Sequence, residues 1–400
     1  MSSSFAQDKA SSLSTAAASY IAQGQYSKAE LALKRALAIR ALSIGDEISD
    51  KNYADIASAT RNLAKLYAEA KKYKKSENLL KRAIEMDQRS QGENYPDSST
   101  DLNLLISLYE AQGKANETEP FYRTLIASYE KKGAETSTSS AVAANNLANI
   151  YIANKKYEDA EILLKKALAI NERNFGPGEH AVAMSLNNLA AAYTAQSKYS
   201  EAEPLLERSL AIDEQVFGKD SPQIIAGLNN LAAVYSYEKK YQESEALYRR
   251  ALAIMESNAQ TDQGEIAKTL NNIAVIYSYQ KKYADAEPIL ARALQISENK
   301  YGPDHPAVAA ALNNLAVAFL SQAKNDAAEP LFKRALTIAE KDPRRNYAIM
   351  TESLRSLGSM YESQGKYIEA ESFYTKMVDL YNNVLDKNSP EVAMASSDLA

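Results

Sequence analysis

Hydrophobic positions in this chain recur with the spacing of an amphipathic helix, and they do so in pairs of stripes. Between residues 222 and 257, one helix face is formed by Leu228, Leu231, Ala232 and Tyr235. After the polar break "EKKY", a second stripe is formed by Ala246, Leu247, Ala251, Leu252 and Ile254. Spacings of three and four residues are typical of a helix that buries one face. The pattern therefore predicts two helices joined by a short turn, an αα-hairpin.

This hairpin pattern returns along the chain with a fixed period. An aromatic residue marks the first helix of a copy every 42 residues, at Tyr67, Tyr109, Tyr151, Tyr193, Tyr235, Tyr277, Phe319 and Tyr361. An earlier copy at Tyr20 precedes Tyr67 by 47 residues. A second tyrosine usually follows six residues later, at Tyr26, Tyr73, Tyr157, Tyr199, Tyr241, Tyr283 and Tyr367. Ala115 and Asn325 break this rule in the third and eighth copies. Such a period predicts stacked repeats, because one hairpin cannot bury its apolar stripe alone.

Short motifs mark where the helices of each copy begin and end. The first helix is preceded by "DSPQ" (220–223) or "DHPA" (304–307). We expect Ser221 and His305 to be N-caps, with a proline at the first helical position, where a missing N–H costs little. Glycine-containing turns, "FGPGE" and "YGPDH", are expected to end the second helix of the preceding copy.

These residues resemble a known repeat family. The pattern Leu189-Ala190…Tyr193…Tyr199…Ala202…Leu206…Ser209-Leu210 is similar to a tetratricopeptide repeat. The 42-residue period with "GPDHPAVAAALNNLA" (302–316) resembles the longer repeats of kinesin light chains. The resemblance implies an all-α fold, a right-handed superhelical solenoid of helix-turn-helix repeats that binds segments of other proteins along its concave side. We expect a flexible N-terminus at 1–7, and nine full repeats plus half of a tenth at 8–400.

The last stretch, "SPEVAMASSDLA" (389–400), is half of a repeat without a partner helix. Its apolar face would be left uncovered by this chain, because stability in a repeat protein comes from the interfaces between neighbours. Two interpretations follow. Either the natural chain continues, or this end meets another molecule, which includes self-association through the C-terminal end.

Paired asparagines occur inside the first helices of the central copies. The stretch "LNNLA" stands at 186–190, 228–232 and 312–316, with "ANNLA" at 144–148 and "LNNIA" at 270–274. At about 100° per residue, the second asparagine of each pair points away from the core of its repeat. The resemblance implies that this residue hydrogen-bonds the backbone of a bound peptide, in a ladder of Asn146, Asn188, Asn230, Asn272 and Asn314.

An amide suits that role because it offers a donor and an acceptor without a charge. The alternative is that an asparagine bonds a neighbouring helix, and we favour it for the first residue of each pair, as at Asn187. The surrounding positions are mostly small or apolar, such as Ala191, Ala233 and Val275. In the middle of the array only Lys268 is charged, so the sequence predicts no clamp for acidic peptides. Tyr237 and Tyr279 could stack on ligand side chains or pack within the repeat.

Composition limits the classes of partner. The 400 residues are 46% hydrophobic and 24% charged, with 13 Gly and 11 Pro, which is typical of an ordered, helical chain. A net charge of −5 without a basic patch argues against nucleic acid as a partner. No stretch approaches the roughly 18 apolar residues of a spanning helix, so we expect no membrane insertion. The absence of cysteine excludes disulfides, thiolate nucleophiles and cysteine-bound metal.

An enzymatic function finds little support. A glutamate lies ten residues after each repeat aromatic, at Glu30, Glu77, Glu119, Glu161, Glu203, Glu245, Glu287, Glu329 and Glu371. In six copies a Lys or Arg follows four residues later, so we interpret the row as helix-surface ion pairing rather than acid–base or metal chemistry. The two histidines, His180 and His305, lie in turns about three repeats apart. We predict no catalytic residues, no metal and no cofactor.

Three functional hypotheses follow. The first is a non-catalytic scaffold that binds extended peptide segments of partner proteins in its groove. The second is a structural scaffold that self-assembles through exposed terminal repeats, and the third is an enzyme. In "SSSFAQD", Ser4 and Ala6 occupy the minus-three and minus-one positions of a signal-peptidase site before Gln7. This pattern favours an exported protein, in a bacterial periplasm or secreted, with the cytoplasm as the alternative.

Overall fold

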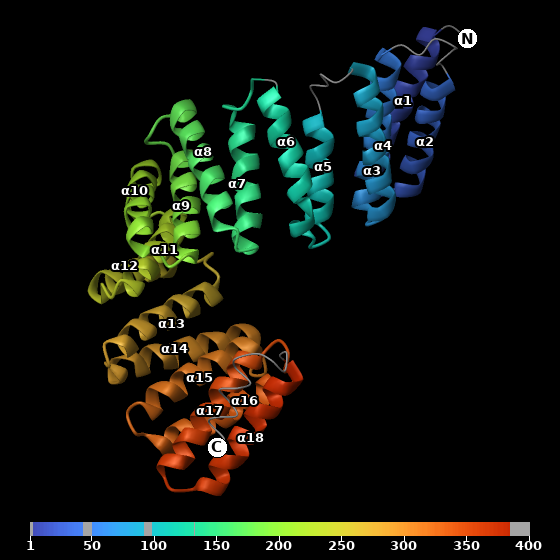
Figure 1. The fold of residues 1–400 in the computed structure, drawn as a ribbon. Coiled ribbons are helices and arrows are strands. Elements are labelled where there is room, and N and C mark those ends of the chain that lie inside the picture. Colours follow the sequence, from blue (N-terminus) through green and yellow to red (C-terminus); the bar gives the residue numbers. More distant parts are fainter. Residues whose placement is uncertain (1–2, 43–49, 92–97, 132, 385–400) are drawn as a thin grey trace. The chain divides into compact units, whose positions relative to one another are not determined.

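The computed structural model describes residues 3–42, 50–91, 98–131 and 133–384. Within these ranges the chain forms eighteen α-helices and two short 3₁₀-helices, and no strand. Within each of its two compact units, successive helices pack as antiparallel neighbours, as Figure 1 shows. The chain divides into two compact units, Met1–Gln196 and Ser197–Ala400.

Unit 1 contains nine α-helices and one 3₁₀-helix in its described residues. In chain order they are α1 (Ser3–Ala22), α2 (Tyr26–Leu42), α3 (Asp50–Glu69), α4 (Tyr73–Gln91), α5 (Ser98–Glu110), η2 (Ala115–Thr118), α6 (Glu119–Lys131), α7 (Thr138–Ala153), α8 (Tyr157–Phe175) and α9 (His180–Ala195). Helix α1 begins at Ser3 and so includes residues 3–7, which the sequence analysis assigned to a flexible start. Because Ser3–Ala22 contains neither Pro nor Gly, nothing in the sequence interrupts the helix there.

Unit 2 also contains nine α-helices and one 3₁₀-helix in its described residues. They are α10 (Tyr199–Phe217), η3 (Pro222–Ile224), α11 (Ile225–Tyr237), α12 (Tyr241–Ser257), α13 (Gln263–Tyr279), α14 (Tyr283–Tyr301), α15 (Pro306–Leu320), α16 (Asn325–Ala339), α17 (Tyr347–Ser363) and α18 (Tyr367–Val384). The predicted half of a tenth repeat lies outside the described residues.

The predicted helix caps are confirmed. The Ser221 hydroxyl accepts a bond from the Gln223 N–H, with Pro222 at the first helical position. The His305 side chain accepts from the Ala307 N–H, and Pro306 starts α15. Gly302 ends α14 with φ of 84°, a left-handed conformation that glycine adopts without steric cost. Local sequence therefore determines where these helices start and stop.

Each hairpin turn also contains a left-handed residue, and most of these are not glycine. Lys71, Lys155, Lys239 and Lys281 have φ between 56° and 63°. Gly113 and Gly365 occupy the same place in their copies, with φ of 72° and 73°. A residue with a β-carbon is strained in this region, so the lysines hold a conformation that glycine would adopt more easily.

The core of each repeat is built from the predicted stripes, with one correction. Leu228, Leu231 and Ala232 are buried in α11. In α12 the buried stripe includes Ala251 and Leu252, as predicted, but Ala246 is exposed and Tyr248 is buried instead. The spacing explains this difference, because residues 244, 248, 251, 252 and 255 share one helix face and residue 246 lies on the opposite face.

Candidate peptide-binding face

The first helices of successive pairs contact one another within each unit. In unit 1, α7 contacts α9, and in unit 2, α13 and α17 both contact α15. The solvent side of these helices is the surface on which the predicted asparagines lie. We call it the first-helix face, defined by Val142, Asn146, Met184 and Asn188 in unit 1, and by Asn230, Tyr237, Asn272, Val275, Tyr279 and Asn314 in unit 2. Val142 and Met184 are 53% and 55% exposed, and Val275 is 43% exposed, so apolar side chains meet solvent in both units.

Two predicted amides are fully available on this face. Asn272 is exposed on α13, and Asn188 is half-buried on α9. Among the residues that the structure describes, none hydrogen-bonds to either side chain. Asn230 on α11 is exposed as well. At Asn188 and Asn272, both the donor and the acceptor of the amide can therefore serve a ligand.

Asn146 and Asn314 are half-buried and also link helices. The Nδ2 of Asn146 donates to the Tyr122 hydroxyl at 3.0 Å, across from α7 to α6. The Nδ2 of Asn314 donates to Oδ1 of Asn271 at 3.1 Å, across from α15 to α13. The predicted ladder is thus not uniform, because Asn146 and Asn314 each donate one of their two amide N–H groups to the fold and keep the other N–H and the carbonyl oxygen.

The first asparagine of the pair bonds helix neighbours, as predicted, at two positions in unit 2. Asn271 donates to the Ala267 carbonyl at 2.9 Å and accepts from Asn314. Asn313 is only 6% exposed and accepts a bond from the Ser353 hydroxyl at 3.0 Å, from α17. A buried amide needs such partners, because an unsatisfied polar group is costly. These asparagines hold first helices together.

Tyr237 and Tyr279 pack on other tyrosines of the chain, which is one of the two roles that the sequence left open. The Tyr237 ring stacks on Tyr199 with centroids 4.6 Å apart and planes inclined by 11°. The Tyr279 ring stacks on Tyr241 at 5.7 Å and 23°. Both rings nevertheless remain 57% exposed. Each is therefore held in place by a tyrosine at the start of the preceding second helix, and more than half of its side chain remains exposed to solvent.

Charge on the first-helix face of unit 2 is neutralised locally. The Lys268 ammonium lies 2.6 Å from the Glu265 carboxylate on the same helix. This hydrogen bond raises the pKa of Lys268, which therefore stays protonated. A lysine paired in this way is a weak anchor for a peptide carboxylate.

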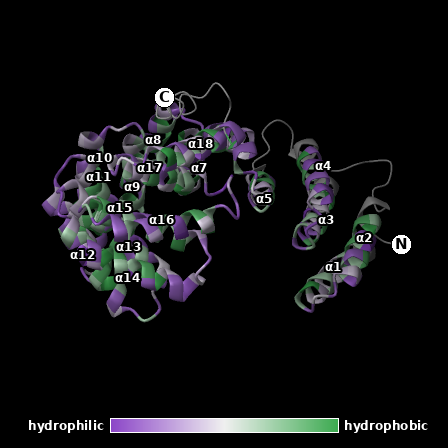
Figure 2. Cartoon of the chain, turned by 90° about the horizontal axis from the view of Figure 1, so that it is seen from below, coloured by the Kyte–Doolittle hydropathy of each residue, from purple (hydrophilic) through white to green (hydrophobic). Residues whose placement is uncertain are grey.

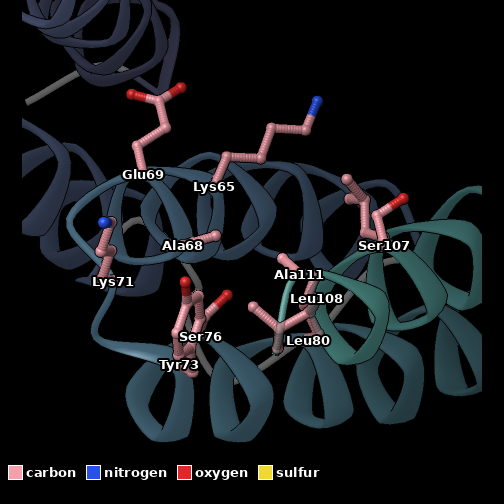
Figure 3. Close-up of a pocket in the computed structure, with 11 residues that line it drawn as sticks. Lys65, Ala68, Glu69, Lys71, Tyr73, Ser76, Leu80, Ser107, Leu108 and Ala111 are labelled. Carbon is pink, nitrogen blue, oxygen red and sulfur yellow. The ribbon is translucent and has the colours of Figure 1, made fainter. Parts of the chain in front are cut away.

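Two hollows in unit 1 were not predicted. Figure 3 shows the first, a pocket of about 220 Å³ between α3, α4 and α5, in which Leu80, Leu108 and Ala111 lie close together. The second, of about 230 Å³, lies between η2, α6 and α7. It is lined by Glu110, Ala115, Tyr122, Asn146, Asn149 and Ala153, among others. The sequence signal for the second hollow was Ala115, which replaces the second tyrosine of its repeat.

The row of glutamates is structural. All six predicted pairs with a Lys or Arg four residues later are present, at 2.5 to 3.1 Å: Lys34–Glu30, Lys81–Glu77, Arg123–Glu119, Lys165–Glu161, Arg249–Glu245 and Lys333–Glu329. In five copies the repeat tyrosine also donates its hydroxyl to the glutamate of the preceding copy: Tyr67 to Glu30, Tyr109 to Glu77, Tyr193 to Glu161, Tyr277 to Glu245 and Tyr361 to Glu329. The sequence did not predict this second bond, although the constant spacing of tyrosine and glutamate was visible.

The protonation states of these glutamates and tyrosines do not suit general acid–base catalysis. The hydrogen bond from Lys333, followed by that from Tyr361, lowers the pKa of Glu329. Burial, followed by the bond to Glu245, raises the pKa of Tyr277. The glutamate therefore stays ionised and the tyrosine neutral around pH 7. Among the described residues, no group of His, Asp and Glu could hold a metal ion.

Comparison with known sequences identifies the family. A sequence model of the tetratricopeptide repeat matches residues 55–131, 139–215, 181–257 and 265–341, and a second one matches residues 10–47 and 351–391. The chain therefore belongs to the tetratricopeptide repeat family, and its fold is the predicted all-α tetratricopeptide solenoid. No curated protein matches the full sequence significantly.

Several solved structures are similar to this chain. The apo form of RapI is 14% identical, with a TM-score of 0.61 over 94% of this chain and 98% of that one. Aspartyl phosphate phosphatase F from Bacillus subtilis is 16% identical, with a TM-score of 0.50 over 89% and 94%. A putative kinesin light chain from Podospora anserina with nearly identical repeats is 24% identical, with a TM-score of 0.48 over 52% and 98%. At these identities the likeness concerns the fold.

The family indicates the general role. Tetratricopeptide repeats are generally non-catalytic scaffolds that bind other proteins, and this chain carries them along most of its length. None of the described helices is both long and apolar enough to cross a bilayer. In Figure 2, hydrophilic and hydrophobic residues alternate along the helices, as expected for helices with one buried face.

Proposed function

We propose that this protein captures extended segments of partner proteins along its first-helix face. The observation that carries this proposal is that each unit has an unpartnered amide on its first-helix face, Asn188 in unit 1 and Asn272 in unit 2, among exposed apolar side chains such as Met184 and Val275. An exposed amide with both hydrogen-bonding groups open suits a peptide backbone, which presents an alternating donor and acceptor. The exposed rings of Tyr237 and Tyr279 add apolar contact area on the same face.

The repeat spacing fits an extended peptide. Packed helices lie about 8–10 Å apart, and an extended chain advances about 3.3 Å per residue. Successive first helices therefore meet the peptide about every third residue. In unit 2, Asn230, Asn272 and Asn314 lie on α11, α13 and α15 and would together span on the order of six peptide residues.

Recognition of this kind reads the main chain more than the side chains. Each net hydrogen bond is worth about 0.5–1.5 kcal/mol, so binding through the amides alone is modest and tolerant of sequence. Because Lys268 is already paired with Glu265, we expect the affinity to depend little on ionic strength.

The test is titration calorimetry with a peptide mapped from a partner that the full chain retains. We expect Asn188→Ala with Asn272→Ala to weaken binding by about 1–3 kcal/mol, the loss of two such bonds, with unchanged helicity. The matched control is Asn313→Ala, which removes a buried acceptor for Ser353 and should lower stability while affinity is kept. Unchanged affinity in the double variant, or a loss of affinity only in the control, would contradict the proposal.

Two further points stay proposals. Self-association through the C-terminal end concerns residues 385–400, outside the described part of the chain. A mass that rises with concentration in sedimentation would support it, and a constant mass would count against it.

We also propose export from the cytoplasm, supported by Ser4 and Ala6 in the pattern of a signal-peptidase site. Fractionation of source cells tests this, and recovery in the cytoplasm alone would contradict it.

A further inference from the structure

In two copies of the repeat a stacked pair of tyrosines fills the same place, and in the third copy both of these tyrosines are replaced by alanine. The pairs Tyr199–Tyr237 and Tyr241–Tyr279 join residues that are 38 positions apart. Two periods upstream of Tyr199 and Tyr237, the same positions are occupied by Ala115 and Ala153. Both alanines are exposed and line the hollow of about 230 Å³. Space that two rings fill elsewhere is open here.

The walls of this hollow carry hydrogen-bond acceptors. Tyr122 is only 4% exposed, and its hydroxyl donates to the Glu110 carboxylate at 3.2 Å and accepts from Asn146 at 3.0 Å. No cation pairs with Glu110 among the described residues. One oxygen of Glu110 and the carbonyl oxygen of Asn146 thus remain as acceptors beside the apolar wall of Ile150 and the two alanines.

The local backbone differs here as well. The second helix of the other copies starts directly at the second tyrosine, or at Asn325 in the eighth copy, whereas this copy begins with the 3₁₀ turn η2. The Thr118 hydroxyl donates to the Ala115 carbonyl at 2.6 Å within that turn. Thr118 is buried, so the rim of the hollow is fixed by the chain itself.

We propose that this hollow, the Ala115 pocket, receives an aromatic side chain with a hydrogen-bond donor, a tyrosine or a tryptophan, from the bound partner segment. The proposal rests on the proposed function and deepens it. A cavity of about 150 Å³ is enough to bind benzene, so a single ring fits. An acidic side chain would meet the Glu110 carboxylate, and an aliphatic one would leave the acceptors unpaired.

The position of the pocket agrees with a peptide on the first-helix face. Asn146 belongs to both the pocket and the predicted ladder. Alternate side chains of an extended segment point to the same side. A peptide that bonds the carbonyl oxygen of Asn146 can therefore place one ring in the Ala115 pocket, which gives side-chain selectivity to a face that otherwise reads the backbone.

The experiment uses N-acetyl-L-tryptophanamide and the full chain. Because the protein contains no tryptophan, emission of the probe can be followed without background. The test variant, Ala115→Tyr with Ala153→Tyr, rebuilds a pair that the chain already holds at Tyr199 and Tyr237. Ile162→Tyr, at a 67% exposed site on α8, is the control for an added tyrosine.

We expect saturable binding to the wild type and to the Ile162→Tyr control, and at least tenfold weaker binding to the rebuilt pair. Ala153→Leu, which fills the space from one wall, should weaken binding in the same direction if the double variant loses helicity. Equal binding to all variants, or competition by N-acetyl-leucinamide or N-acetyl-argininamide as strong as by N-acetyl-tyrosinamide, overturns the proposal. The probe contains no peptide segment, so this failure would leave the amide test at Asn188 and Asn272 to decide the proposed function.

Discussion

Replacing Tyr277 by phenylalanine removes one hydroxyl from the contact between α12 and α13. That hydroxyl donates to Oε1 of Glu245 at 2.6 Å and accepts a bond from the Arg249 guanidinium, and Tyr277 is 7% exposed. The same carboxylate accepts a bond from Arg249 at 2.7 Å. The substitution keeps the ring and its packing, so it measures the link between two repeats with little change in buried apolar area.

The expected cost follows from the geometry. Hydrogen bonds to charged groups contribute about 1.5–3 kcal/mol. In the variant the Glu245 carboxylate keeps its ion pair with Arg249. The Glu245 side chain is 21% exposed, so water can replace part of the lost hydrogen bond. We therefore expect Tyr277→Phe to lower the free energy of unfolding by about 1–2 kcal/mol.

Urea unfolding followed by circular dichroism measures the total, and native-state hydrogen exchange locates it. Because each repeat contacts its neighbours only, protection should fall mainly in α12 to α14. Tyr283→Phe is the matched control, since no described residue hydrogen-bonds to the Tyr283 hydroxyl. Equal losses in the two variants, or a loss of protection spread evenly over unit 2, would refute the interpretation of Tyr277 as a link between repeats.

Three further outcomes are expected. Hydrogen bonds from Lys333 first and then Tyr361 lower the pKa of Glu329 below 4.5, so the stability that this carboxylate contributes is present above that pH and is lost in acid. In urea titrations at different pH values, Glu329→Gln should therefore reduce the fall of the unfolding free energy below pH 4.5. Burial first and then the charge of Glu110 raise the pKa of Tyr122 to about 12, so the stability that this tyrosine contributes is lost between about pH 10 and 12. Tyr122→Phe should remove the part of the fall in melting temperature that occurs over this pH range. Lys281→Gly should raise the unfolding free energy by about 0.5–1 kcal/mol in urea titration, because residue 281 has φ of 58°.

Features set by neighbouring residues could be predicted from the sequence. The caps at Ser221 and His305 depend on bonds to residues two positions away, and the glutamate pairs depend on residues four positions away. The period predicted the stack of helix pairs because each copy shows the same apolar stripe. At Ala246 the prediction was wrong, because the helical period places residue 246 on the face opposite to Tyr248 and Leu252.

Features set by distant residues could not be predicted. The bonds of Asn146 to Tyr122 and of Asn314 to Asn271 join residues 24 and 43 positions apart. An asparagine of the same motif is free at position 272, because its partners depend on the helices placed around it. The Ala115 pocket had a visible signal in the missing tyrosine, but its second alanine, Ala153, gains meaning only once the stacking of Tyr237 on Tyr199 is known.

The central claim is that partners bind the first-helix face, and site-specific photo-crosslinking tests it most directly. Val275 on α13 lies on that face, and Val216 on α10 lies on a second helix; both are valines, and both are 43% exposed. A photo-reactive amino acid is placed at one or the other position in the full chain, and the crosslinked partner peptide is identified by mass spectrometry. We predict that a single extended segment is captured from position 275 and not from position 216. Equal capture from both positions, or capture from position 216 alone, would contradict the account.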